Sequence, residues 1–125
     1  MEAIAVDGGK GTVELGADGV IRLVWKPGVV LEAVDIHAAM AAVNEVAGAQ
    51  EYPMLVDMEG VGAVTRQARA VFSIPCAASR VALLGSGPVD RVLATFIVGV
   101  SPPCSTRFFT SREDALKWLL QSLNP

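Results

Sequence analysis

Residues 53–72 read Pro-Met-Leu-Val-Asp-Met-Glu-Gly-Val-Gly-Ala-Val-Thr-Arg-Gln-Ala-Arg-Ala-Val-Phe, and this stretch decides the fold. The apolar run 54–56 predicts a buried strand that ends on a carboxylate, Asp57. Gly60 and Gly62 then loosen the backbone before a helix whose start is marked by Thr65. In an α/β fold, a polar cluster at the C-terminal end of a strand is where ligands and partners usually dock. The stretch therefore indicates where a site should lie, more than which chemistry it performs.

On the N-terminal side of this stretch, two β-like segments, 12–15 and 20–25, flank a Gly-Ala-Asp-Gly turn at 16–19. Apolar residues alternate with mixed ones along the second segment, which predicts an antiparallel hairpin with one buried face. A helical pattern follows over residues 32–47 and ends at Gly48.

On the C-terminal side, helix and strand patterns alternate. Segments 65–74 and 89–100 have helical spacing, and segments 80–84 and 106–109 have the pattern of strands. Ser111-Arg-Glu-Asp resembles a capping box that opens a final helix. The inward-facing residues of that helix are predicted to be Ala115, Leu116, Leu119, Leu120 and Leu123.

The resulting order, ββ-αβ-αβ-αβ-α, predicts an α/β fold with a mixed sheet. Short connections between alternating strands and helices favour right-handed crossovers, so only the first hairpin strand should be antiparallel. We expect one domain over residues 1–125, with a core at about 12–121, packed with about four helices. Residues 1–10 have little pattern and are expected to form a loose or weakly paired arm.

Composition excludes several classes of protein. With 52% hydrophobic and 18% charged residues the chain is not disordered, and its net charge of −3 argues against nucleic-acid binding. No apolar stretch reaches the ~20 residues that span a bilayer. The N-terminus lacks the pattern of a signal peptide, so we expect a cytoplasmic protein. Cys76 and Cys104 lack metal-ligand spacing and are expected to be buried thiols; no cofactor or metal is predicted.

Four local signatures resemble the STAS domains of bacterial anti-sigma-factor antagonists. They are Leu-Val-Asp-Met-Glu-Gly-Val at 55–61, Arg-Val-Ala-Leu-Leu at 80–84, Pro-Val-Asp-Arg-Val at 88–92, and the strand–helix segment 106–119. The chain is similar in particular to a set of small, uncharacterised bacterial STAS-like proteins, over about residues 12–121. The resemblance implies the STAS fold and a protein that binds other proteins.

In the antagonists, a kinase phosphorylates a serine where the central strand leads into its helix, within Asp-Ser-Ser-Gly. Laid against this chain, that motif falls on Thr65, Arg66, Gln67 and Ala68, so the switch serine is absent. The resemblance thus predicts loss of the phospho-switch. Thr65 is the one hydroxyl left there, and it is either a helix N-cap or a functional group.

Two further clusters are candidate sites. Asp57 and Glu59 could share acid–base chemistry, but we favour their accepting backbone N–H groups or pairing with Arg66 or Arg69. Gly85-Ser86-Gly87 before a helix could hold an anion, helped by Arg91, or could be only a tight turn. The lone His37 lacks partners for a zinc site or a catalytic triad. The candidate interaction or ligand site comprises Asp57, Glu59, Thr65, Arg66, Arg69, Ser86 and Arg91.

Residues 92–100 of the predicted helix 89–100 include no charged residue. A helix packed on a sheet needs only one apolar face, so we expect a second surface to cover the other face. The alternatives are its own terminal loops, a subunit or partner, and a lipid or small apolar ligand. The candidate interface residues are Val92, Leu93, Phe96, Ile97 and Val100.

The sequence therefore favours a non-enzymatic STAS-like domain that acts through protein association. We expect a homo-oligomer and favour a dimer. Its protein partner is unknown. The alternative is a small-ligand module, for an anion or an apolar molecule, with a pocket at the C-terminal strand ends. An enzyme is the third reading, because no nucleophile–base pair or cofactor loop is found.

Overall fold

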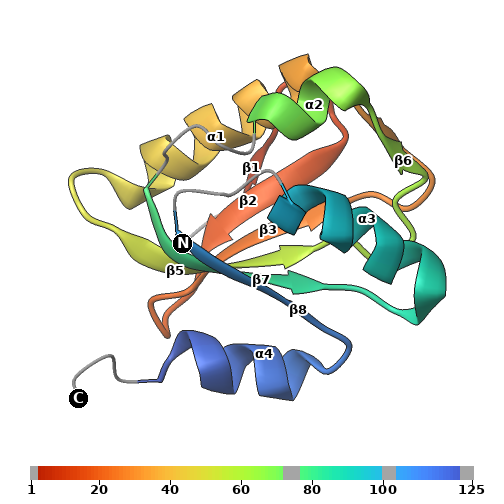
Figure 1. Cartoon of the computed structure of the whole chain (residues 1–125). Helices are drawn as coiled ribbons and strands as arrows, with labels where there is room; N and C mark the ends of the chain where they lie inside the picture. The colour runs from red at the N-terminus through yellow and green to blue at the C-terminus, as the bar shows by residue number, and fades with distance from the viewer. Residues whose placement is uncertain (1–2, 72–76, 100–103, 122–125) are drawn as a thin grey trace.

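The computed structural model describes residues 3–71, 77–99 and 104–121, with side chains omitted for residues 96–99. A six-stranded sheet, in the order β1-β2-β3-β5-β7-β8, forms its centre (Figure 1). The strands are β1 (Ile4–Ala5), β2 (Gly11–Leu15), β3 (Ile21–Trp25), β5 (Tyr52–Asp57), β7 (Ala78–Leu84) and β8 (Ser105–Phe109). Pairing is antiparallel from β1 to β3 and parallel from β3 to β8. The predicted mixed sheet is confirmed.

The predicted hairpin joins β2 to β3, with Val13 opposite Leu23. Gly19 has a φ of +79°, a conformation that glycine adopts at little cost. The Asp18 carboxylate fixes the turn by accepting hydrogen bonds from the Val20 N–H at 3.1 Å and from the Arg22 guanidinium at 2.8 Å. A second, two-stranded sheet of β4 (Val30–Leu31) and β6 (Ala63–Val64) was not predicted.

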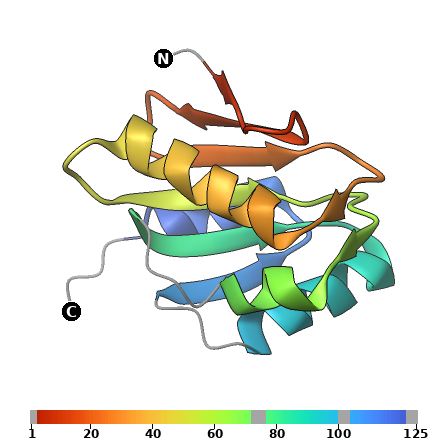
Figure 2. The same ribbon diagram turned by 90° about the horizontal axis from the view of Figure 1, so that it is seen from above.

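Four helices cover the central sheet: α1 (Ala33–Ala47), α2 (Arg66–Val71), α3 (Gly87–Gly99) and α4 (Arg112–Leu119). The first three lie on one face, and α4 is the one helix of the described residues on the other (Figures 1 and 2). The main core is packed between the sheet and α1–α3. A smaller core of six buried residues lies under α4: Val20, Leu55, Ala82, Leu84, Ala115 and Leu119.

The N-terminal segment is paired rather than loose. Its strand β1 adds to the edge of β2, and Val6 is fully buried. Lys10 donates to the Asp35 carboxylate at 2.8 Å and to the Val30 carbonyl at 2.7 Å. Asp35 also accepts the Glu32 N–H at 2.8 Å, which caps α1. The described residues 3–10 therefore pair with the edge of the sheet.

Helix α4 buries Ala115 and Leu119, as predicted, and Leu116 is half-buried. Leu120 is 53% exposed, so its predicted inward position is wrong: the helix ends at Leu119, and the turn after it directs Leu120 outward. Leu123 lies outside the described residues. The helix is capped at Ser111, whose Oγ accepts the Asp114 N–H at 3.3 Å.

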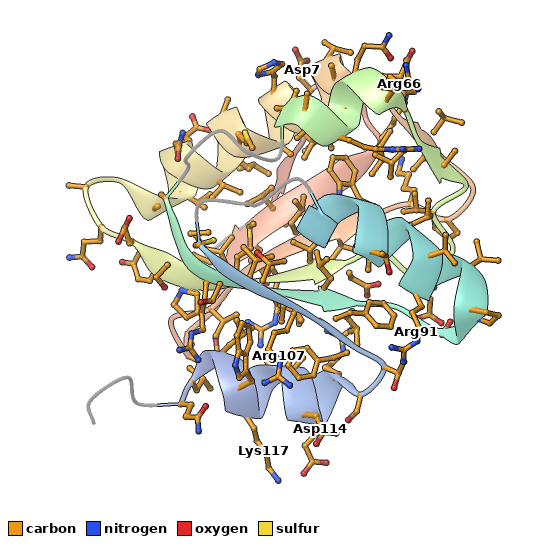
Figure 3. The ribbon with its side chains drawn as sticks, in the orientation of Figure 1. Asp7, Arg66, Arg91, Arg107, Asp114 and Lys117 are labelled. Carbon is orange, nitrogen blue, oxygen red and sulfur yellow. The ribbon has the colours of Figure 1, made fainter. Side chains whose placement is uncertain are left out.

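The C-terminal end of α4 is held by a buried cation. The Arg80 guanidinium donates to the Trp118 carbonyl at 2.6 Å and lies 4.6 Å from the centre of its ring. Arg107, labelled beside α4 in Figure 3, lies 5.6 Å from the same ring. A cation at a helix C-terminus satisfies its last carbonyl groups and opposes the helix dipole.

Candidate functional site

The parallel strands β3, β5 and β7 end at the same edge of the sheet, and the loops that follow them enclose an open groove of about 680 Å³. We call it the strand-end groove. Its lining comprises Val24, Trp25, Pro27, Asp57, Glu59, Gly60, Val61, Gly62, Ser86, Val89 and Asp90. The predicted location, at the C-terminal strand ends, is where this hollow lies.

Asp57 is the last residue of β5, in register with Val24 on one side and Leu84 on the other. One carboxylate oxygen, Oδ1, accepts the Glu59 N–H at 3.2 Å and so shapes the turn after the strand. The other, Oδ2, receives the Arg112 guanidinium at 3.1 Å. Asp57 thus links the groove to the first residue of α4.

The loop after β5 and the loop after β7 meet in the lining of the groove. The Ser86 hydroxyl donates to Glu59 Oε1 at 3.2 Å, and the Ser86 N–H donates to Asp90 Oδ2 at 2.7 Å. Asp90 is only 4% exposed. Gly85 is required here, because a Cβ at this position would lie 2.7 Å from Asp90 Cβ and 3.0 Å from the Phe108 ring. The Asp90 carboxylate, from the first turn of α3, therefore binds the backbone N–H that precedes this helix.

This arrangement disfavours the anion site that was one of the two alternatives for residues 85–87. The Ser86 N–H, which an anion would need, already binds Asp90. The lining includes three carboxylates, and none of the described residues that form it is Lys, Arg or His. The electrostatic potential of the groove therefore favours a cation.

The other predicted site residues lie apart from the groove. Thr65 caps α2 by accepting the Ala68 N–H at 3.2 Å. Arg66 projects from α2, and Arg69 is half-buried on the same helix (Figure 3). Arg91 lies on α3 with its guanidinium 5.0 Å from the Phe108 ring. The partner that Asp57 was expected to find in Arg66 or Arg69 is instead Arg112, since α2 is carried away from β5 by the 58–65 connection.

Two of the candidate interface residues on α3 can be described. Val92 is 53% exposed, whereas Leu93 is buried against the main core. The side chains of Phe96 and Ile97, and Val100 altogether, lie outside the described residues.

Val24, Val89 and Asp90 belong to the groove lining but were not predicted as site residues, and neither was Arg112, which pairs with Asp57 from outside the lining. The contact of Asp90 with the Ser86 N–H could have been predicted, because Asp90 follows Ser86 by four residues at a helix start. The pairing of Arg112 with Asp57 spans 55 residues and could not have been predicted in this way. Cys104 is half-buried rather than buried, and Cys76 is not among the described residues.

The sheet order, the single α4 on one face and the strand-end groove define a STAS-like α/β domain. The chain belongs to the family described as a domain of unknown function, DUF7793, whose model matches residues 14–123. Among curated proteins, none matches the chain.

Two solved structures are similar to it. An uncharacterized protein of the DUF3478 family from Shewanella loihica PV-4, with a SpoIIAA-like fold, has a TM-score of 0.61 and 19% identity, covering 87% of this chain and 91% of its own. This likeness confirms the predicted STAS-like fold. A protein with unknown function from Arthrobacter sp. FB24 is 53% identical over 88% of this chain and 99% of its own, with a TM-score of 0.37.

Two negative findings concern the described residues only. None of their helices is long and apolar enough to cross a membrane. Across the same ranges, no three His, Cys, Asp or Glu side chains are grouped so as to hold a metal ion.

Proposed function

We propose that this protein is a non-enzymatic interaction domain that binds a partner protein at the strand-end groove and along the adjoining outer face of α3. The observation that supports it is exposed apolar surface beside the groove. Val24 is 41% exposed and Val89 is 65% exposed, and both line the hollow. Val92 extends this surface one turn along α3. Contiguous exposed apolar residues with a polar rim are typical of protein-binding surfaces.

The chemistry available in the groove supports binding over catalysis. Its hydroxyl–carboxylate pair, Ser86 with Glu59, is exposed to water, where a carboxylate is a weak base. The backbone N–H of Ser86 is engaged by Asp90 and so is not available to stabilise an oxyanion. The absence of the switch serines, replaced by Arg66 and Gln67, and the capping bond of Thr65 support an interaction that phosphorylation at this helix start does not control.

Site-specific photo-crosslinking in the native cell tests the proposal. A benzoylphenylalanine at position 89 should give a discrete crosslinked protein. Position 34 is the matched control, because Val34 is also a valine near a helix start and is 68% exposed. Equal crosslinking at both positions, or none at position 89, would contradict a partner at the groove.

A second candidate function is binding of a small cationic molecule. The groove exceeds the roughly 300 Å³ of small-ligand sites, and carboxylates from two loops converge on it. Native mass spectrometry of the protein purified from its own cells would detect such a ligand as a discrete mass increment that Glu59→Gln reduces.

A further inference from the structure

We infer that the strand-end groove accepts an arginine side chain flanked by apolar residues, presented by a segment of the partner protein, and that Arg112 competes with that side chain for Asp57 from outside the groove lining. The inference rests on the proposed function and names the chemistry of the partner segment.

Charge is the first reason. The groove lining holds Asp57, Glu59 and Asp90, and its described residues include no cation to balance them. Arg112 neutralises Asp57 from outside the lining. Asp90, although buried, is compensated only by the Ser86 N–H and the positive end of α3, not by an ion pair with any described residue. A cation that entered the groove would therefore meet two carboxylates without a counter-ion.

Arg112 shows that a guanidinium can pair with a carboxylate of the groove lining. Its Nη2 lies 3.1 Å from Asp57 Oδ2, and the side chain of Arg112 is 52% exposed. A half-exposed ion pair contributes about 1 kcal/mol or less, so a second guanidinium can displace it. The planar fork of arginine matches carboxylate oxygens better than the compact ammonium of lysine does.

The apolar rim is the second reason. Val24, from β3, and Val89, from α3, belong to elements on different sides of the carboxylates. A partner segment that places apolar side chains on both sides of an arginine would cover these valines while its guanidinium reaches the acidic floor. A partner segment that offers charge alone would leave both valines exposed.

The test is an NMR titration of the full chain with Ac-Val-Arg-Val-NH2, with Ac-Val-Gln-Val-NH2 as the uncharged control. We expect saturable shifts at the amides of Val24, Gly60, Ser86 and Val89 with the arginine peptide only. Glu59→Gln or Asp57→Asn should weaken binding by about tenfold. The control Glu113→Gln changes net charge equally at an exposed site on α4, paired only with Lys117, and should have no effect.

Replacing Arg112, which pairs with Asp57, distinguishes binding at the groove from non-specific attraction of a cationic peptide to an acidic protein. Arg112→Gln should strengthen binding of the arginine peptide by up to about fivefold, because Asp57 is then vacant. Lys117→Gln removes the same charge from the same helix and should not strengthen it. Equal shifts from both peptides, shifts elsewhere, no saturation, or identical effects of the two variants would overturn the inference. Crosslinking at position 89 without peptide binding would leave the proposed function standing; peptide binding without a crosslinked protein would refute the proposed function instead.

Discussion

Replacing Leu119 by alanine should destabilise the fold far more than replacing its neighbour Leu120 by alanine. Leu119 is 4% exposed and packs in the small core under α4, whereas Leu120 is 53% exposed beyond the helix end. The two substitutions remove the same atoms from adjacent positions. A large loss at Leu119 therefore reports on burial, because alanine favours a helix at least as well as leucine does and composition is matched.

The magnitude follows from the size of that core. Among the described residues it contains six buried side chains, two of them from α4, Ala115 and Leu119, so neighbouring side chains have little freedom to fill a cavity. A buried Leu→Ala change costs 2–5 kcal/mol, and we expect about 3 kcal/mol for Leu119. Leu120→Ala should cost roughly 0.5 kcal/mol or less, as surface changes do. For a domain of this length, about 3 kcal/mol corresponds to a fall in Tm of about 12 °C.

Urea unfolding followed by far-UV circular dichroism would measure both variants against the parent chain. The midpoint for Leu119→Ala should fall with little change in slope if the domain unfolds in one step. A lower slope would indicate that α4 has already separated in the folded state of the variant. Equal losses for Leu119→Ala and Leu120→Ala, or a larger loss for Leu120→Ala, would refute the packing described for α4.

Three other predictions concern different elements. If the outer face of α3 buries apolar area in a dimer, sedimentation velocity at micromolar concentration should show a dimer that Val92→Asp weakens; a wild-type monomer at high concentration would contradict self-association. Thr65→Ala should cost about 1 kcal/mol through loss of the α2 cap, and intact-mass analysis from native cells should show no phosphate at Thr65; a stoichiometric phosphate there would restore the switch. Burial raises the pKa of Asp35, but the hydrogen bonds from Lys10 and Glu32 outweigh burial and lower that pKa below 3.8. The stability that Asp35 contributes is therefore present above pH 3.8 and is lost as pH falls through the folded-state pKa. Asp35→Asn should therefore cost about 1–3 kcal/mol near neutral pH and progressively less in acid; urea titrations showing a constant difference would contradict the ion pair.

The sheet could be predicted because its determinants are local. Alternation in 20–25, the Asp18-Gly19 turn and the apolar runs before Asp57 and Gly85 each specify a strand within a few residues. The alternation of strands with helices then leaves few topologies. The position of the groove followed from the same reasoning, since parallel strands share one C-terminal edge.

The parts that could not be predicted depend on contacts between distant segments. Pairing of β4 with β6 involves two residues on each side, which is too short for a periodic signal. The attachment of Arg112 to Asp57 spans 55 residues. The anion site, one of the two alternatives for residues 85–87, could not be excluded from the sequence, because a glycine-rich helix start is open to anions in isolation, whereas here the Asp90 carboxylate accepts the Ser86 N–H.

The isolation of α4 on its own face has a consequence for dynamics. Because only two of its side chains are fully buried, its amide hydrogens should exchange with solvent through local opening, at a free energy below that of global unfolding. Arg112 is the first residue of that helix, so each opening also releases Asp57. If a ligand binds the groove through Asp57, as proposed above, its binding should be coupled to the protection of the α4 amides, and hydrogen exchange in α4 would then report on occupancy of the groove.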